Sequence, residues 1–434
     1  VPGLSLGGIG QWFNRHETWA EMGKVWADYM ARSCFMLQSG LNVADVLWYY
    51  GEDSCVSTEF GHKPFTVPTG YQWDYVSPNI LVKDITAKKG VLVAPGGVNY
   101  KVLYMDRNVD YMSVPVLRQI ASFAKAGVWI GGVKPKYPAS LADDKAEFDS
   151  LVKDIWGSGR SNVIECGSLE ELLKAASVQP DVKFSDGMKY LHRSLPTAEV
   201  YWINKPSMDY KTVSVSFRTS GLVPQVWHPD TGVIEDVTYR TEGDRTVVEL
   251  NMVPDDAVFV VFYGKGAAEQ TLAAVSESSL LTVEGPWNVT FQQRRGAPEG
   301  ATFETLRSYT DFEEPGIKYF SGIATYTNTL KAPAVSGKAV LDLGNVQNLA
   351  EVYVNGQFCG YAWKEPYRVD VTSALKEGDN SLEIRVANTW PNRLIGDQQP
   401  GVTPVTYTDS RPYRAGDPLR DGGLMGPVKL FSLQ

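Results

Sequence analysis

A segment near the first residue combines the side chains that a carbohydrate pocket needs. Residues 11–19 read QWFNRHETW, in which Trp12 and Trp19 flank a run of polar side chains. The flat face of a Trp ring can stack on the apolar face of a sugar ring, and Asn, His and Glu side chains can exchange hydrogen bonds with sugar hydroxyl groups. This segment is therefore the first candidate site. The alternative is that the two Trp residues are core anchors.

Carboxylates occur in the same segment and again after a predicted strand. Glu17 and Glu21 lie one helical turn apart, and Glu52 and Asp53 follow the apolar run VADVLWYY. Cleavage of a glycosidic bond needs two carboxyl groups about 5–10 Å apart across the bond. In open α/β sheets ligands bind at the carboxyl ends of strands, which makes the second pair a candidate. The alternatives are that the first pair stabilises the positive end of a helix and that the second pair forms a turn.

Other chemical motifs are incomplete. GLSLG, residues 3–7, matches G-x-S-x-G, but only Val1 and Pro2 precede it, and a nucleophile elbow needs a strand there. HETWA begins like the H-E-x-x-H zinc motif and has Ala20 where the second His should stand. The four His and four Cys residues are scattered without metal-ligand spacing. We expect no metal site of these kinds, no required cofactor and free thiols.

Composition excludes two classes of partner. The chain has 434 residues, 43% of them hydrophobic, and a net charge of −9 that is spread along the chain. Nucleic acid is an unfavourable partner because the chain has no basic block. No apolar run approaches the ~18 residues of a membrane span, so we expect no transmembrane segment.

Helical and strand patterns alternate up to about residue 178. The segment 18–40 predicts a helix with Met22, Trp26, Met30 and Leu37 on one stripe and Gly40 as its stop. Further helices are predicted after Ser77-Pro78, over SVPVLRQIASFAKAG, and over SLEELLKAA with a capping box at Ser168 and Glu171. The runs VADVLWYY, GVLVAP, YKVLYM and VWIGG between them predict strands. Residues 42–178 therefore predict an open, flavodoxin-like or amidotransferase-like parallel sheet with helices on both faces.

The rest of the chain predicts antiparallel β structure. Short alternating runs over 179–266 indicate a small β-sandwich, and GKGAAEQ, residues 264–270, has the composition of a linker. Residues 283–434 indicate a second sandwich, best described as a jelly roll. Within it, VNGQ predicts an Asn-Gly hairpin turn.

Extended parts of the chain resemble one enzyme family. WFNRHETWAEMGKVWADYMARSCFMLQSGLNVADVLWYYGED closely resembles the segment that ends the catalytic (β/α)8 barrel of glycoside hydrolase family 106, the α-L-rhamnosidases. GYQWDYVSPNIL and GVLVAPGGVNYKVLYMD resemble the α/β domain of that family. VNGQFCGYAWKEPYRVDVT, NTWPNRLIGD and GGLMGPVKL resemble its terminal sandwich, a galactose-binding-like domain shared with family 2 glycosidases. The likeness is strongest at 11–53 and 317–430 and weak across 180–265.

The resemblance implies a multidomain α/β plus all-β protein without its catalytic barrel. A (β/α)8 barrel takes about 250 residues, and only about 42 residues precede the first predicted core strand. Residues 1–41 would be the remnant of the barrel, and the rest of it would be the covalent neighbour of this chain. The catalytic carboxylates of the family lie in that part. We therefore expect no catalytic residue here and no activity of the chain alone.

The resemblance also implies site residues, a ligand and a location. Asn14, His16 and Glu17 would line a sugar pocket, with Trp12 or Trp19 as the stacking platform; the competing interpretation is that they cap and orient the helix. Trp390 would be a further sugar platform or part of a loop that packs on the barrel. The ligand would be a rhamnose-containing glycan, and the location the periplasm, the cell surface or the outside of a bacterium. Calcium is compatible with the resemblance, although the chain has no D-x-D-x-D-G loop. The alternative function is a stand-alone carbohydrate-binding or scaffold protein.

Overall fold

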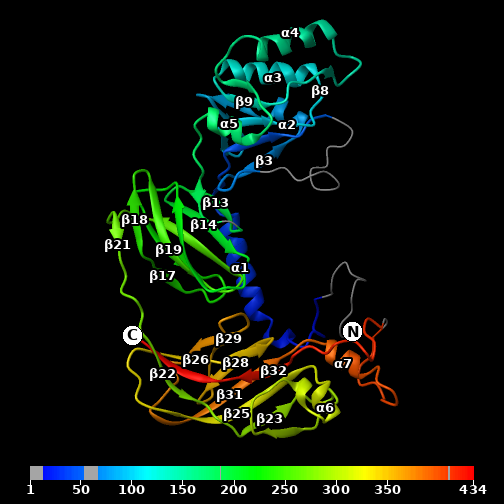
Figure 1. Cartoon of the computed structure of the whole chain (residues 1–434), viewed down its shortest axis with the longest axis vertical. Coiled ribbons are helices and arrows are strands. Elements are labelled where there is room, and N and C mark those ends of the chain that lie inside the picture. The colour runs from blue at the N-terminus through cyan, green and yellow to red at the C-terminus, as the bar shows by residue number, and fades with distance from the viewer. Residues whose placement is uncertain (1–12, 53–66, 186, 409–410) are drawn as a thin grey trace. The chain divides into compact units, whose positions relative to one another are not determined.

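The structure is a computed structural model that describes residues 13–52, 67–185, 187–408 and 411–434 (Figure 1). The chain divides into two compact units. One unit comprises Ala31–Leu272, and the other comprises Ala273–Gln434 together with the chain up to Met30. No helix in the described ranges is both long and apolar enough to cross a lipid bilayer.

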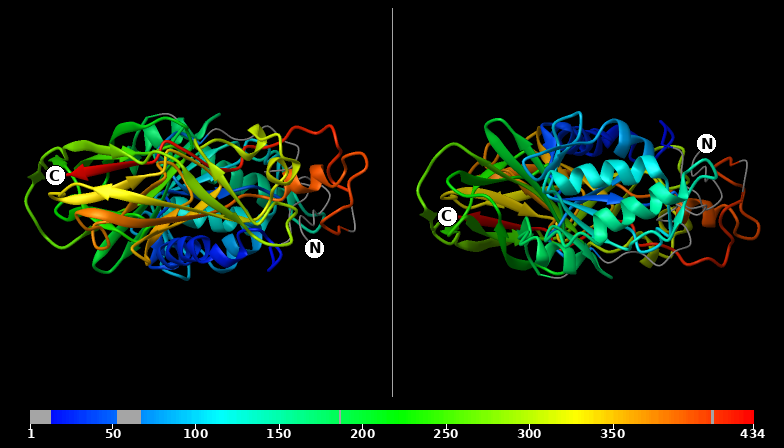
Figure 2. Two further views of the ribbon diagram at one scale, coloured as in Figure 1. Left: turned by 90° about the horizontal axis from the view of Figure 1, so that it is seen from below. Right: turned by 90° about the horizontal axis from the view of Figure 1, so that it is seen from above.

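The larger unit begins with an α/β part built on a five-stranded parallel sheet. Its strands in spatial order are β11 (Val163–Glu165), β9 (Trp129–Gly132), β7 (Val102–Met105), β2 (Val46–Tyr49) and β3 (Trp73–Val76). Its helices are α2 (Pro78–Lys83), α3 (Val114–Lys125), α4 (Lys145–Trp156) and α5 (Leu169–Ala175). Figure 2 shows α3 and α4 side by side over the sheet. The predicted parallel sheet is confirmed.

Alternate residues of the interior strand β2 pack into different cores. Leu47 and Tyr49 belong to a cluster that includes Leu117 of α3, whereas Trp48 belongs to a cluster that includes Leu172 of α5. Because side chains of a strand alternate between the two faces of a sheet, helices cover both faces, as the alternating pattern predicts.

The residues predicted to begin two of the helices, Ser77 and Ser168, are the N-caps of α2 and α5 in the structure. The Ser77 hydroxyl accepts a hydrogen bond from the Ile80 N–H at 3.4 Å, and Pro78 is the first residue of α2. The Ser168 hydroxyl accepts one from the Glu171 N–H at 3.3 Å. The Glu171 carboxylate in turn accepts the Ser168 hydroxyl at 3.2 Å and the Gly167 N–H at 3.3 Å.

Two small sheets lie outside the parallel sheet. The run GVLVAP forms β5 (Val91–Val93), which pairs in antiparallel fashion with β4 (Thr86–Lys88) and β6 (Asn99–Tyr100). β8 (Tyr111–Met112) and β10 (Tyr137–Pro138) form a two-stranded parallel sheet.

The second part of the larger unit consists of two antiparallel sheets. The six-stranded sheet contains, in order, β1 (Leu41–Asn42), β13 (Lys189–Leu195), β14 (Ala198–Lys205), β20 (Asp256–Tyr263), β16 (Val223–Trp227) and β17 (Ile234–Asp236). The five-stranded sheet contains β12 (Val182–Lys183), β15 (Lys211–Phe217), β19 (Arg245–Met252), β18 (Tyr239–Glu242) and β21 (Glu269–Gln270). Tyr201 of one sheet and Phe217 of the other share one core, as the sandwich prediction requires.

The expected linker at 264–270 needs a correction. Its last two residues form β21, in which Glu269 pairs with Arg240 and Gln270 with Tyr239 of β18. The segment has a polar, glycine-containing composition because it crosses the surface before it reaches this sheet edge.

The smaller unit is a sandwich of a six-stranded and a four-stranded sheet. The six-stranded sheet contains β24 (Gly300–Phe303), β23 (Trp287–Phe291), β25 (Ile323–Ala332), β31 (Gly378–Ala387), β28 (Leu349–Val354) and β29 (Gln357–Ala362). The four-stranded sheet contains β22 (Glu277–Thr282), β33 (Lys429–Leu433), β26 (Lys338–Asp342) and β30 (Arg368–Asp370). The remaining elements are β27 (Asn345–Gln347), β32 (Gly423–Gly426), η2 (Tyr309–Asp311), α6 (Pro315–Lys318) and α7 (Pro391–Gly396).

The predicted hairpin turn joins β28 to β29. Asn355 has a φ of 52° and Gly356 a φ of 76°. Positive φ at both central residues is the requirement of a type I′ turn, which explains the Asn-Gly pair.

The first helical segment differs from its prediction. A short helix η1 (Ala20–Met22) precedes α1 (Lys24–Gln38), and Gly40 ends the segment with a φ of 64°. Met22 is buried, but Trp26 is 42% exposed and Met30 is 39% exposed. The predicted stripe is therefore not a single buried face, because Met22 and Val25 pack in a small cluster with Ile323, Leu349 and Ala387 of the six-stranded sheet, outside the sandwich core. Trp26 remains partly exposed.

Candidate functional site

The segment around Asn14 forms a tight turn ahead of η1. The Asn14 side-chain oxygen accepts a hydrogen bond from the His16 N–H at 2.8 Å, and its carbonyl accepts one from the Glu17 N–H at 3.1 Å. Asn residues favour turns because their side chains bond to the backbone two residues further on. Asn14 is exposed and has this local role, which was the alternative to its role in a pocket.

This turn is anchored to the loop that leads into α7. Trp390 donates its indole N–H to the His16 carbonyl at 2.9 Å, and the Thr18 hydroxyl donates to the Asn388 carbonyl. Glu17 is buried beside these contacts. The structure therefore brings His16, Glu17 and Trp390 together within the smaller unit.

Trp390 has a packing role, which the sequence alone did not distinguish from a role in sugar binding. Its side chain is 3% exposed, and the Arg295 guanidinium lies 4.4 Å from the centre of its ring. A ring so covered offers no face to a ligand. Trp390 thus anchors the segment around His16, which corrects the expectation of a sugar platform at this position.

Glu52 lies in the larger unit, at the N-terminus of α3. Its carboxylate accepts the Ser113 N–H at 2.7 Å and the Tyr49 hydroxyl at 3.2 Å. Ser113 is the N-cap of α3, where backbone N–H groups carry partial positive charge. The observed contacts fit a structural role, and a role in binding stays a prediction. Trp12 and Asp53, also predicted as binding residues, lie outside the described residues.

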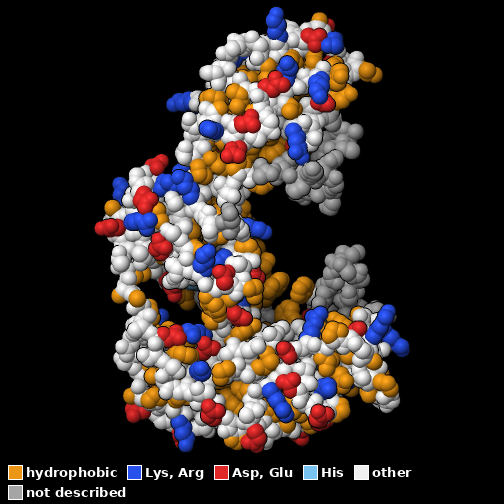
Figure 3. Space-filling model, in the orientation of Figure 1, with side chains coloured by type: hydrophobic (Ala, Val, Ile, Leu, Met, Phe, Trp, Pro, Cys, Tyr) orange, Lys and Arg blue, Asp and Glu red, His pale blue; other side chains and the backbone are white. Residues whose placement is uncertain are grey.

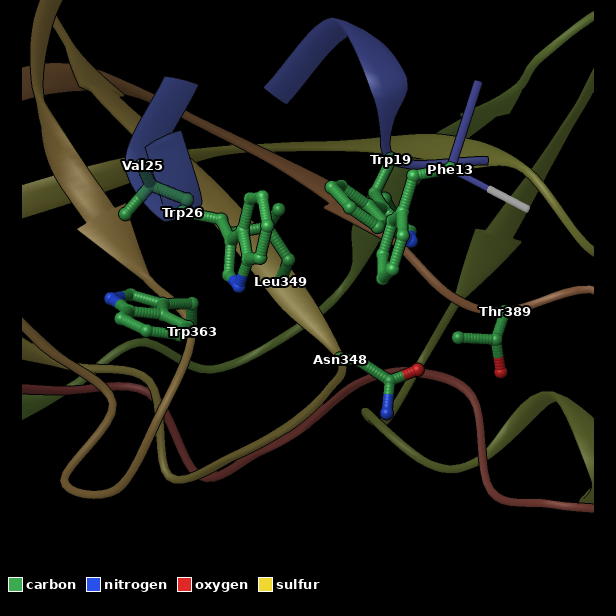
Figure 4. A pocket seen from close by; sticks show the side chains of 9 residues that line it. Phe13, Trp19, Val25, Trp26, Asn348, Leu349, Trp363 and Thr389 are labelled. Carbon is green, nitrogen blue, oxygen red and sulfur yellow. The ribbon is translucent and has the colours of Figure 1, made fainter. Parts of the chain in front are cut away.

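A pocket of about 230 Å³ in the smaller unit includes one predicted residue, Trp19. Its lining residues are Phe13, Trp19, Val25, Trp26, Asn348, Leu349, Trp363, Ala387 and Thr389. In Figure 4 the Trp26 and Trp363 rings lie on one side, the Phe13 and Trp19 rings on the other, and Asn348 and Thr389 along one edge. We call these nine residues the aromatic pocket.

Ring contacts fix the walls of the aromatic pocket. Phe13 stacks on Trp26 with ring centres 5.5 Å apart and planes at 12°. Phe13 also meets Trp19 edge to face at 5.9 Å, and Trp363 meets Tyr29 in the same way at 5.5 Å. The space-filling view shows apolar side chains exposed where the start of α1 meets the sandwich (Figure 3). The pocket is thus a preformed, largely apolar concavity, as small-molecule sites usually are.

Sequence reasoning missed Trp26, Trp363, Asn348 and Thr389. Trp26 was assigned only to a stripe of the first predicted helix, and the others lie more than 300 residues further along the chain. Asn348 is held by β31, because its N–H donates to the Ala387 carbonyl at 2.9 Å. An accessible Trp on the first helix would have been the only signal, and spacing alone does not distinguish an accessible Trp from a buried one.

Side chains that commonly bind metal ions do not gather among the described residues. Among them, no group of three or more His, Cys, Asp or Glu side chains is placed to hold a metal ion. The three cysteines that the structure describes, Cys34, Cys166 and Cys359, are free.

A family model and a solved structure both indicate the α-L-rhamnosidases. Residues 1–241 match the family model for glycoside hydrolase family 106, described as alpha-L-rhamnosidase, and residues 309–416 match a glycosyl hydrolase 2 galactose-binding domain-like model. A rhamnosidase structure from Novosphingobium sp. PP1Y is 40% identical in sequence with a TM-score of 0.94, covering 99% of this chain and 43% of its own.

A curated relative from Formosa agariphila carries the name "Putative beta-glucuronidase". It is 23% identical and aligns with 99% of this chain and 59% of its own length. The chain thus spans about 43% and 59% of the two longer proteins. Since the first family model covers more than half of the chain and the structural match nearly all of it, the chain belongs to glycoside hydrolase family 106, the α-L-rhamnosidase family.

Proposed function

We propose that this chain is the C-terminal part of an α-L-rhamnosidase that removes terminal α-L-rhamnose from glycans. The observation that carries the proposal is the 40% identity to the Novosphingobium rhamnosidase over 99% of this chain, at a TM-score of 0.94. The chain covers 43% of that enzyme, which leaves room for a further large domain in the intact protein.

The chemistry of the intact enzyme is acid–base cleavage by paired carboxylates across the glycosidic bond. A catalytic (β/α)8 barrel needs eight parallel strands, whereas the largest parallel sheet in the described part of the chain has five. We therefore assign the catalytic carboxylates to a barrel that is the covalent neighbour of this chain. The chain by itself would be inactive.

Within this proposal the turn before α1 forms one wall of the sugar pocket of the intact enzyme. Asn14, His16 and Glu17 would present polar groups, and Trp19 or Trp12 would stack on the sugar. Since Trp19 lines the aromatic pocket, Trp12 is the platform that this proposal favours for the sugar pocket of the intact enzyme. Because the His16 carbonyl and the Thr18 hydroxyl bond to the loop before α7, the backbone on both sides of Glu17 would be preorganised.

The proposal extends to details of the fold. The parallel sheet has the strand order second-first-third-fourth-fifth, which is the flavodoxin-like order. We assign the final sandwich, whose match is to a galactose-binding domain-like model, to the jelly-roll class. By resemblance the intact enzyme would act in the periplasm, at the cell surface or outside a bacterial cell. Calcium stays compatible with the resemblance, and no step is assigned to it.

The test compares this chain with a protein that extends upstream along the same gene. Both are assayed for rhamnose release from an aryl α-L-rhamnoside. We expect release by the extended protein and none by this chain. Release of rhamnose by this chain alone at enzymatic rates would overturn the assignment of the catalytic groups to the barrel. If the extended protein cleaves only other glycosides, the assignment of α-L-rhamnosides as substrates would be wrong.

A second candidate function is a stand-alone carbohydrate-binding or scaffold protein. The aromatic pocket favours it, since the pocket is complete within one unit of this chain. A gene without an upstream reading frame, together with binding of the isolated chain on a glycan array, would favour this function over the first.

A further inference from the structure

We propose that the aromatic pocket is a non-catalytic binding site for one 6-deoxyhexopyranosyl residue with the configuration of L-rhamnose. The class of ligand rests on the proposed function, and the site rests on the geometry of the pocket. All nine lining residues belong to the smaller unit, so the site is built within that unit.

The size of the pocket suits a single sugar ring. Its volume is about 230 Å³, below the ~300–1,000 Å³ of sites for drug-sized ligands. An oligosaccharide would therefore place one residue in the pocket and leave the others in solvent. A terminal sugar, or one on a short branch, meets this requirement best.

The walls suit the apolar parts of a sugar. Trp19, Trp26 and Trp363 contribute indole rings from two sides of the pocket. Trp rings give a large and rigid contact surface at a small cost in conformational entropy. Since Trp26 is 42% exposed, it is open to a ligand from solvent.

Two polar side chains on one edge of the pocket, Asn348 and Thr389, can fix the orientation of a bound sugar. Asn348 donates one amide N–H to the Gln347 side-chain oxygen at 3.0 Å. Among the described residues, no hydrogen bond is found to the side-chain oxygen of Asn348 or at the Thr389 hydroxyl. These groups can therefore exchange hydrogen bonds with ring hydroxyls while the opposite side of the sugar meets the rings. A few placed polar groups in an apolar pocket are the usual source of orientation.

The apolar lining favours a methyl group over a hydroxymethyl group at C6. A hydroxyl group directed at the indole rings would lose its hydrogen bonds to water without gaining a partner, and this loss costs free energy. A 6-deoxyhexose avoids the cost because its C6 is a methyl group. The site should therefore discriminate between sugars that differ only at this position.

The test is calorimetric titration of this chain with methyl α-L-rhamnopyranoside and with methyl α-L-mannopyranoside. The second glycoside has the same configuration and carries a hydroxyl on C6. We expect a dissociation constant of about 1 mM for the rhamnoside. We expect binding of the mannoside to be about tenfold weaker, within the range for small groups in apolar pockets.

Two variants on α1 localise the binding. Trp26→Ala removes one wall and should weaken rhamnoside binding about tenfold. Trp26→Phe keeps a ring and should recover part of the affinity. Phe35→Ala is the matched control, because Phe35 is an exposed aromatic residue on the same helix and lines a different pocket, of about 240 Å³, in the larger unit. Circular dichroism checks that each variant is folded.

The possible results separate this proposal from the proposed function. If the rhamnoside gives no heat, or if Trp26→Ala binds it as well as the unchanged chain does, the site is not a sugar site and its occupant is a polypeptide or nothing. If Phe35→Ala alone loses binding, the ligand occupies the other pocket and the proposal fails. Neither result bears on rhamnose release by the extended protein, which is measured separately.

Discussion

At the scale of single residues, His192 is a buried titratable group of the larger unit that lies between two carboxylates. Its Nδ1 lies 2.8 Å from the Asp181 carboxylate and its Nε2 lies 2.9 Å from that of Glu199. The Tyr201 ring stacks on the imidazole at 3.8 Å, and Arg218 pairs with Asp181 at 3.4 Å. Burial lowers the pKa of His192, but the two carboxylates raise it more, so that it lies above 6.5.

This environment predicts a pH-dependent contribution to stability. Because the pKa of His192 is higher in the folded chain than in the unfolded chain, its contribution is complete below about pH 6.5 and is lost as the pH rises through the folded pKa. Replacing it in His192→Gln should therefore lower the free energy of unfolding more at about pH 6 than at about pH 9.

Denaturant unfolding of both proteins at the two pH values measures this difference. The second histidine of this part with a raised pKa, His228, is present in both proteins, so that its effect cancels. An equal effect of the substitution at both pH values would show that the imidazole does not change its charge in this range.

At the scale of elements, the parallel sheet depends on a close approach between β7 and β9. Gly132, the last residue of β9, has a φ of 119°, and a Cβ at this position would lie 2.1 Å from the Met105 carbonyl oxygen. The Gly132 N–H also donates to the Cys166 sulfur at 3.2 Å. Only a residue without a Cβ allows both contacts.

Gly132→Ala should therefore lower the free energy of unfolding by about 3 kcal/mol or more, through backbone strain and a steric clash. The matched control is Gly159→Ala, where φ is 70° and a Cβ would meet nothing within 4 Å. Gly159→Ala therefore adds backbone strain without a steric clash, and it should lower the free energy of unfolding by about 1 kcal/mol. Chemical denaturation gives both values, and equal losses would mean that the β7–β9 contact relaxes without cost.

At the scale of the whole molecule, the two units predict two unfolding transitions. Each has its own hydrophobic core, and multidomain chains commonly depart from two-state unfolding. Arg218 belongs to the larger unit, where it pairs with the buried Asp45 at 3.0 Å. Trp287 is buried in the core of the smaller unit.

Calorimetry of two variants tests this prediction. Arg218→Ala removes the cation that the buried Asp45 and Asp181 carboxylates share, although Asp45 keeps Lys101 and Asp181 keeps His192. It should destabilise the larger unit by about 2 kcal/mol, less than the loss of a fully uncompensated buried pair. Trp287→Ala removes a core side chain and should destabilise the smaller unit by about 3–5 kcal/mol. Each variant should shift a different transition. A single transition that both variants shift together would show that the chain unfolds as one cooperative body.

Local patterns predicted much of this architecture. Val46–Tyr49 was predicted as a buried strand of a parallel sheet, because a short uninterrupted apolar run between helical segments is typical of a strand that is covered on both faces. The Asn355-Gly356 turn and the Ser77 cap follow from backbone requirements that involve only neighbouring residues. The family resemblance, too, was visible in continuous motifs, and the comparisons confirm it.

Contacts between distant segments were decided by the tertiary structure alone. The spacing of Trp26 and Met30 placed them on one stripe of a helix. Spacing does not show whether another element packs against that stripe, and in the structure both residues are partly exposed. Trp390 was a candidate for stacking until its burial against Arg295 was known. The sequence by itself thus determined the types of element and the family. Only the folded chain brought Trp19 and Trp26 beside Asn348 and Trp363, because a pocket depends on side chains far apart in the chain and not on the order of neighbours.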